Sequence, residues 1–318
     1  MKPGTSGSTK GMQTSAALRR FTRTAENASS AVIENYSTSF GLATRLLGRR
    51  HRTHVRNVYA MVRVADEIVD GVTAEAGLGV EQQRQVLDQY ERDVHRALQL
   101  GYSSDLVIHA FARSARAAGI DTSLTAPFFE SMRLDLATAQ GERLAFDPSM
   151  HARYVHGSAE VVGLMCLRIF VRERNFDWSA SAEQAMDNPA DESSLLNHGA
   201  CQLGAAFQNI NFLRDLADDT SRLGRNYLTD TGTLDDAGRD AWVAIIRRQL
   251  ADAERIIPLL PKDARAAVRS ALALFSSLTN RISQTPAAEL HRVRVRVADP
   301  TKLFLAGRAL VTTWTEHN

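Results

Sequence analysis

Residues 55–70 read VRNVYAMVRVADEIVD, and this stretch decides the fold. Its apolar residues recur every three or four positions, which is the spacing of one face of an α-helix. The same spacing returns in residues 203–216 and 242–250, whereas the alternating passage at 292–297 has no second strand with which to pair. The sequence therefore predicts an all-α protein. Loops are expected near residues 71–80, 186–194 and 228–238.

The composition is that of an ordinary globular protein. The chain has 318 residues, of which 44% are hydrophobic and 23% charged, and this excludes collagen-like and largely disordered classes. The 38 basic residues nearly balance the 36 acidic ones, so the charge gives no sign of nucleic-acid binding. The two cysteines show neither a disulfide framework nor zinc-ligand spacing.

The domain organisation predicted from the sequence is simple. Residues 1–25 are rich in Gly, Ser, Thr and basic residues and are interpreted as a flexible basic tail, and residues 26–318 as a single all-α domain. The chain has no run of about 18 apolar residues and no apolar signal-peptide core. We therefore expect a soluble, cytoplasmic protein, and peripheral association with a membrane surface stays open.

Two of the predicted helices carry carboxylates in apolar surroundings. Arg63, Asp66 and Asp70 step by three and four, so they share one stripe of the first helix. In the second helix an arc of roughly 80° gathers four polar side chains. These are Gln208, Asn211, Asp215 and Asp219. Like charges four residues apart repel each other, so such helices need a neutralising partner.

The chemistry of these side chains points to a hard cation. Carboxylate and amide oxygens without His or Cys suit magnesium, which commonly binds one or two carboxylates together with substrate phosphate oxygens. Two such helices that face each other could hold a diphosphate between them. The alternative is a solvated helix face with arginine partners, and the presence of two separate motifs argues against it.

The chain resembles the squalene and phytoene synthase family, the head-to-head prenyl synthases, from about Asn35 to Leu310. The matching blocks are Tyr36–Phe40 (YSTSF), Asp66–Asp70, Tyr154–Met165, and an ordered series of Leu203, Gly204, Gln208, Asn211, Arg214, Asp215, Asp219, Arg225 and Tyr227. The resemblance implies an isoprenoid-synthase helical bundle with a central cavity.

The resemblance also implies roles for individual residues. The implied magnesium ligands are Asp66, Asp70, Asn211, Asp215 and Asp219, and manganese is an expected substitute for magnesium. The implied contacts to the substrate diphosphate are Ser37, Ser39, Arg63, Gln208, Arg214, Arg225 and Tyr227. The implied catalytic residues are Asp66, Asp70, Asp215, Asp219 and Tyr154, of which Tyr154 matches a pocket tyrosine discussed as a proton acceptor.

The reaction implied by the resemblance is that of phytoene synthase in carotenoid biosynthesis. Two geranylgeranyl diphosphates would condense head to head through a cyclopropylcarbinyl diphosphate, prephytoene diphosphate, to give phytoene and diphosphate. One alternative is a squalene or dehydrosqualene synthase that uses farnesyl diphosphate. A second is a non-catalytic homologue, which the two intact aspartate motifs argue against.

Two features near the motifs bear on the length of the substrate. Glu160 stands where the family usually has a small residue, so it could alter the depth of the pocket or pair with an arginine. Small residues recur at Gly199, Gly204 and Ala205. They are interpreted either as room for a long apolar tail, which would favour geranylgeranyl diphosphate, or as a device for close helix packing.

Overall fold

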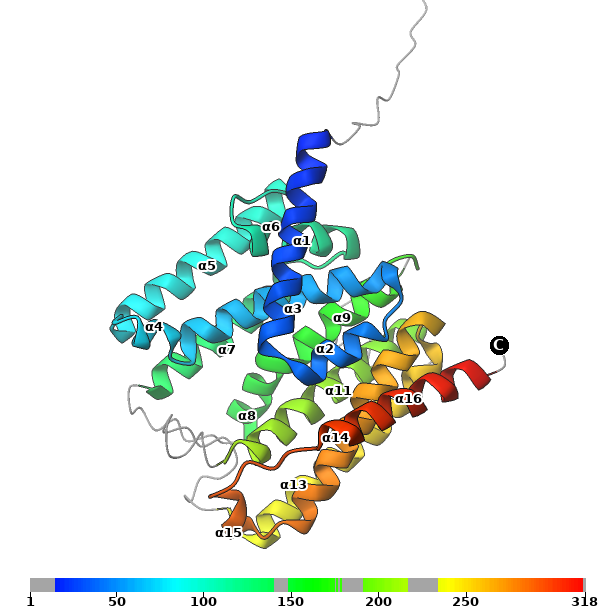
Figure 1. The fold of residues 1–318 in the computed structure, drawn as a ribbon. Helices are drawn as coiled ribbons and strands as arrows, with labels where there is room; N and C mark the ends of the chain where they lie inside the picture. Colours follow the sequence, from blue (N-terminus) through cyan, green and yellow to red (C-terminus); the bar gives the residue numbers. More distant parts are fainter. Residues whose placement is uncertain are drawn as a thin grey trace, which may run out of the picture.

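The computed structural model describes residues 15–139, 148–174, 176, 178, 191–216 and 234–316, except for the side chains of residues 38–40 and 138–139. Within those ranges every regular element is a helix and none is a strand (Figure 1). The helices are α1 (Ala16–Tyr36), α2 (Thr38–Arg45), α3 (Arg49–Val69), α4 (Val72–Glu75), α5 (Val80–Leu100), α6 (Leu106–Ala118), α7 (Thr122–Ala139), α8 (Pro148–Val155), η1 (His156–Glu160), α9 (Val161–Val171), α11 (Glu192–Arg214), α13 (Asp236–Ile256), η2 (Ile257–Leu259), α14 (Lys262–Gln284), α15 (Ala287–Leu290) and α16 (Asp299–Thr315). The predicted all-α class is confirmed, and residues 292–297 form no strand.

Helix α9 joins two hydrophobic cores. Its residues Val161, Met165 and Ile169 step by four and pack into the core formed mainly by α3, α5, α6 and α7. Leu167 and Val171 lie on another face and pack into the core formed by α11, α13 and α14. Because α9 packs into both cores, it places the two halves of the bundle against each other.

The continuous helix from α8 through η1 to α9 is the one described helix that is long and apolar enough to cross a membrane, judged by length and composition. Its most apolar window has a mean hydropathy of 1.3, and 44% of that window is buried inside the protein. Because α9 contributes to both cores, we assign this helix to the interior of the fold. At its centre, η1 is π-helical, with a wider turn than the α-helices on either side.

Small residues let this long helix touch its neighbours backbone to backbone. A Cβ atom added to Gly204 of α11 would lie 2.7 Å from the carbonyl oxygen of Ala159, and one on Gly163 would lie 2.7 Å from that of Ala200. Ala205 is itself a core residue, with 3% of its surface exposed. The structure therefore favours close helix packing as the reason for these small residues.

The amino-terminal region differs from the prediction. Residues 16–25 belong to α1, which packs against α3 and α6, and Ala25 is fully buried. Ser15 begins the helix by accepting a hydrogen bond from the backbone N–H of Leu18. The predicted flexible tail is thus wrong for residues 16–25, where basic side chains occupy the solvent side of a packed helix. Residues 1–14 lie outside the described part of the chain.

The start of α3 is tied to the start of α14. The backbone N–H of Gly48 donates to the carbonyl oxygen of Asp263 at 2.8 Å, and Arg50 donates to both carboxylate oxygens of Asp263 at 2.7 and 2.8 Å. These hydrogen bonds from Arg50 lower the pKa of Asp263 to about 2. One turn further along α3, burial lowers the pKa of His54 to about 4. The junction fixes the position of α3, which carries the first acidic motif at its other end.

Candidate functional site

The first acidic motif lies at the carboxyl end of α3. Asp66 is in the last turn, and Asp70 caps the helix with its backbone N–H donating to the carbonyl oxygen of Asp66 at 2.8 Å. The carboxyl end of a helix carries a partial negative charge, so carboxylates there are unfavourable unless a cation is near. The position of these aspartates therefore favours cation binding over a purely structural role.

Arg63 supplies part of the missing positive charge. It forms an ion pair with Glu67, and its Nη1 lies 3.9 Å from the nearer carboxylate oxygen of Asp66. Its guanidinium also lies 4.7 Å from the ring centre of Tyr36. The Nε–H of Arg63 is buried and donates to no acceptor in the described part of the chain. A free, buried donor beside acidic side chains suits an oxygen of a bound anion.

Ser37 and Tyr59 complete this side of the site. Ser37 caps α1, with its backbone N–H donating to the carbonyl oxygen of Ile33 at 3.0 Å, and its side chain is hydrogen-bonded to Tyr59. Burial raises the pKa of Tyr59, an effect opposed by Ser37 and by the charge of Arg63. The structure thus brings the predicted residues Ser37, Arg63 and Asp66 together around Tyr59. Ser39 lies in α2, and its side chain is outside the described part.

The second acidic motif repeats the geometry of the first. Helix α11 ends at Arg214, and Asp215 caps it with its backbone N–H donating to the carbonyl oxygen of Asn211 at 2.8 Å. Asp70 and Asp215 even share similar dihedral angles, with φ near −91° and −100°. Both motifs therefore place a carboxylate just beyond the last helical turn.

Two arginines neutralise Asp215. Arg214 donates from Nε at 2.9 Å and from Nη2 at 2.5 Å, and Arg294 approaches with Nε at 2.7 Å. Arg294 belongs to the extended segment before α16, 79 residues away along the chain. No local spacing in the sequence relates Arg294 to the aspartate motif, and the alternation of Arg and Val at 292–297 is the one sequence signal that points to this segment.

Two further predicted residues of α11 are Gln208 and Asn211, and both are half-buried. The side-chain oxygen of Asn211 is buried and accepts no hydrogen bond from the described residues. Such an oxygen, one turn before Asp215, fits a hard cation or its bound water. The predicted residues Asp219, Arg225 and Tyr227 lie outside the described part of the chain.

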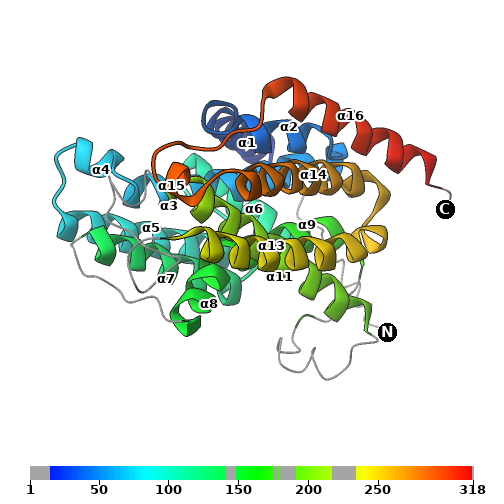
Figure 2. The same ribbon diagram turned by 90° about the horizontal axis from the view of Figure 1, so that it is seen from below.

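The two motifs lie toward one side of the bundle. Figures 1 and 2 show α3 and α11 running in the same general direction, so that their carboxyl ends point to the same side of the molecule. Among the described residues, no three His, Cys, Asp or Glu side chains gather closely enough to hold a metal ion. The donor set of Asp66, Asp70, Asn211 and Asp215 is all oxygen and fits a hard cation, and it stays a prediction.

Tyr154 makes a buried contact that the sequence does not reveal. Its hydroxyl donates to the carboxylate of Asp135, with distances of 2.9 and 3.0 Å to the two oxygens. Tyr154 is 4% and Asp135 3% exposed. A buried carboxylate is costly without such donors, so Tyr154 has a structural role in addition to any part in the reaction. Asp135 comes from α7 and was missed because its sequence context is that of an ordinary helix.

Glu160 pairs with a histidine. Its carboxylate lies 2.9 Å from Nδ1 of His156, across the π-helical turn, and the predicted arginine partner is not what the structure shows. His156 is exposed, as its position on the opposite side of the helix from Tyr154 predicts. Burial, with a smaller effect of Glu160, raises the pKa of Cys201 to about 12. Glu160 therefore lies between the surface and the wall formed by α11.

Comparison with known proteins places this geometry in a family. The family model described as squalene/phytoene synthase matches residues 33–240. A phytoene synthase of Mycobacterium tuberculosis is 26% identical over 306 residues, which cover 90% of each chain. Phytoene synthase 3 of Zea mays is 27% identical over 79% of this chain, which spans 57% of the maize protein's length.

Solved structures agree on the fold. A dehydrosqualene synthase in complex with a ligand superposes with a TM-score of 0.66 at 22% identity, covering 93% of this chain and 99% of that one. A squalene synthase from Alicyclobacillus acidocaldarius superposes with a TM-score of 0.64 at 17% identity, covering 83% and 94% of the two chains. These likenesses show a shared isoprenoid-synthase fold.

Proposed function

Because the chain is a member of the squalene/phytoene synthase family, we propose that it is a phytoene synthase. It would join two geranylgeranyl diphosphates head to head through prephytoene diphosphate and release diphosphate and phytoene, as a cytoplasmic enzyme of carotenoid biosynthesis. The relatives from Mycobacterium tuberculosis and maize both carry the name phytoene synthase, which supports this substrate. The observation that carries the proposal is the pairing of two aspartate-capped helix ends with arginine side chains, Arg63 at the first and Arg214 and Arg294 at the second.

The arginines would bind and polarise the diphosphate. The free Nε–H of Arg63 offers a donor next to Asp66, and Ser37 adds a hydroxyl. At the second helix end Arg214 and Arg294 contact the carboxylate of Asp215 directly. Guanidinium groups match phosphate oxygens with two parallel hydrogen bonds. They would draw charge onto the leaving diphosphate as the C–O bond breaks.

The proposed metal is magnesium, held by Asp66, Asp70, Asn211, Asp215 and Asp219. When bound, such an ion supplies a Lewis acid that stabilises the departing diphosphate. Asp66, Asp70 and Asp215 lie at helix ends whose dipoles disfavour negative charge, and this arrangement is costly unless cations gather there. The unpartnered oxygen of Asn211 supports its place among the ligands.

The buried pair of Tyr154 and Asp135 would accept a proton. The Tyr154 oxygen would take a proton from the carbocation while its own proton passes to the Asp135 carboxylate, 2.9 Å away. This relay leaves both side chains neutral and needs no movement of either helix. Asp135 thereby acquires a role in the proposed reaction through its contact with Tyr154.

The second candidate is a squalene or dehydrosqualene synthase that takes farnesyl diphosphate. The structural neighbours carry these names, which favours keeping the candidate. The small residues along α11 no longer argue for the longer substrate, since helix packing accounts for them. Incubating the purified protein with magnesium and either geranylgeranyl or farnesyl diphosphate, then identifying the hydrocarbon, tests both. Phytoene from the longer substrate supports the proposal, and turnover of farnesyl diphosphate alone refutes it.

A further inference from the structure

Helix α16 turns its bulky apolar side chains toward solvent. Its buried side is made of small residues, Ala306, Ala309 and Thr313, and it packs against α14. Its large apolar residues lie on the other side: Leu303 is 63%, Phe304 68%, Leu310 39%, Val311 64% and Trp314 85% exposed. We call these five residues the α16 apolar face. Figures 1 and 2 show α16 along the outer edge of the bundle.

The α16 apolar face is continuous. At about 100° per residue the five side chains fall within an arc of roughly 120°. Single exposed apolar residues are normal on a protein surface, but a contiguous group of this kind marks an interaction site. A helix that packs through alanines and leaves Trp and Phe in water is therefore suited to bind a surface outside this molecule.

Exposed basic residues lie on α16 and just before it in the chain. Arg308 lies at the edge of the α16 apolar face on the helix, and Arg292 and Arg296 lie between α15 and α16. All three are exposed, and none forms an ion pair with the described residues. Arginine can lay its apolar stem along hydrocarbon while its charged end reaches an anionic head group.

We propose that α16 docks this protein onto an anionic lipid surface, lying in the plane of the interface with its apolar face among the acyl chains. The combination of bulky apolar residues, an exposed Trp and exposed arginines on or just before the helix is what such a helix needs. A second copy of the chain fits less well. In a twofold dimer the same surface meets itself, so the arginines of both copies would be brought to one interface.

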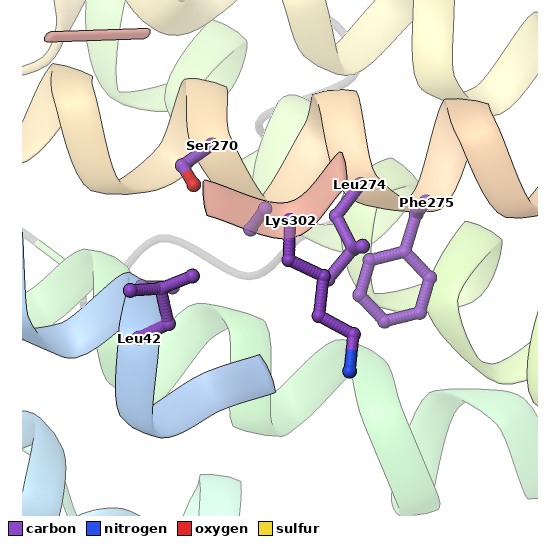
Figure 3. Close-up of a pocket in the computed structure, with 7 residues that line it drawn as sticks. Leu42, Ser270, Leu274, Phe275 and Lys302 are labelled. Atoms are coloured by element: carbon purple, nitrogen blue, oxygen red, sulfur yellow. The ribbon is translucent and has the colours of Figure 1, made fainter. Parts of the chain in front are cut away.

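Packed aromatic side chains lie between α11 and the neighbourhood of α16. Phe207, next to Gln208 in α11, stacks on Phe275 of α14 with ring centres 3.8 Å apart. Phe275 and Leu274 then line a gap between α2, α14 and α16, together with Leu42 and Lys302 (Figure 3). The purpose of the docking rests on the proposed function, because a hydrocarbon product needs an apolar phase to enter. The docking geometry itself does not rest on the proposed function.

Vesicle binding tests the proposal without any substrate. The full-length protein is sedimented with vesicles of phosphatidylcholine alone or of phosphatidylcholine with phosphatidylglycerol, and the bound fraction gives a partition coefficient. We expect binding to the anionic vesicles, weakened by added salt. The variant Leu303→Ser/Phe304→Ser/Trp314→Ser should lower the coefficient at least tenfold. Replacing Arg292, Arg296 and Arg308 with Gln should abolish the preference for phosphatidylglycerol.

The matched control is Leu100→Ser, at the end of α5, where the side chain is 64% exposed outside the α16 apolar face. It should bind vesicles like the wild type. The proposal is refuted if the Leu303→Ser/Phe304→Ser/Trp314→Ser variant binds vesicles as well as the wild type does, or if the wild type does not bind. Light scattering after gel filtration gives the other decisive result. If the wild type is a dimer and the Leu303→Ser/Phe304→Ser/Trp314→Ser variant is a monomer, the α16 apolar face is a protein interface and the proposal is refuted. Each of these outcomes is independent of whether the enzyme makes phytoene.

Discussion

Replacing Tyr154 with Phe removes one hydroxyl and keeps the ring, so it isolates the hydrogen bond to Asp135. Both side chains are almost fully buried, and water cannot readily take the place of the lost donor. A hydrogen bond to a charged acceptor contributes about 1.5–3 kcal/mol. We therefore expect the free energy of unfolding to fall by about 2 kcal/mol. The proposed proton relay predicts a fall in turnover as well.

Urea unfolding followed by far-ultraviolet circular dichroism measures the first effect. The double-mutant cycle with Asp135→Asn should give a coupling energy of roughly 0.5–3 kcal/mol, because the two residues are in direct contact. Tyr90→Phe is the matched control, since its buried hydroxyl donates to a neutral carbonyl of Met61 at 3.3 Å, and its loss should cost about 1 kcal/mol or less. Unchanged stability of the Tyr154→Phe variant would refute the buried contact. Reduced stability with undiminished turnover, measured where all variants are folded, would remove Tyr154 from the reaction.

Four further predictions concern the site and the packing around it. Asp66→Asn and Asp215→Asn should each lower turnover by at least about a hundredfold with little change in melting temperature; near-normal turnover of both would remove the aspartates from catalysis. Turnover should vanish in EDTA and return with magnesium or manganese, and full activity after rigorous chelation would contradict the metal proposal. Gly204→Ala should destabilise the fold by about 1–3 kcal/mol, because the new Cβ would meet a backbone oxygen at 2.7 Å; Gly307→Ala, which points into open space, should show no such loss in urea unfolding. Burial lowers the pKa of His54 to about 4, whereas the same imidazole in the unfolded chain takes up its proton at pH ~6.5. The stability that neutral His54 contributes should therefore be complete above pH ~6.5 and should fall as the pH drops toward 4. If the His54→Gln variant shows an equally steep fall in urea unfolding, another group is responsible.

The sequence predicts well what local spacing determines. Three- and four-residue repeats place Asp66 and Asn211 on helices, and the same repeats predict that α3 and α11 are buried along one side. Contacts between distant segments are a different matter. Nothing near Asp215 indicates that Arg294 will reach it, and nothing near Tyr154 indicates Asp135, because these pairs depend on how helices cross.

Periodicity alone also does not predict which side of an amphipathic helix packs against the rest of the protein. In α16 the apolar pattern reads like that of a core helix, yet the packed side is the one with Ala306 and Ala309. The small residues of α11 were open to two interpretations for a similar reason. Only the approach of Gly204 to Ala159 decides between them. The basic composition of residues 16–25 likewise obscured a helix that is held mainly by a few buried side chains such as Ala25.

The π-helical turn at His156–Glu160 has a consequence for how this protein can change by insertion and deletion. A π turn holds one residue more than an α turn, and each residue of an α-helix advances the chain by about 100°. The π turn absorbs its extra residue within one turn, so deleting one residue there would restore a regular α-helix and leave Tyr154 near its present orientation relative to α9. Deleting one residue from the regular α-helix of α9 would instead rotate Tyr154 by about that angle relative to the rest of α9 and turn it away from Asp135. The π turn is therefore the place in this long helix where the loss of one residue would disturb the contact between Tyr154 and Asp135 least.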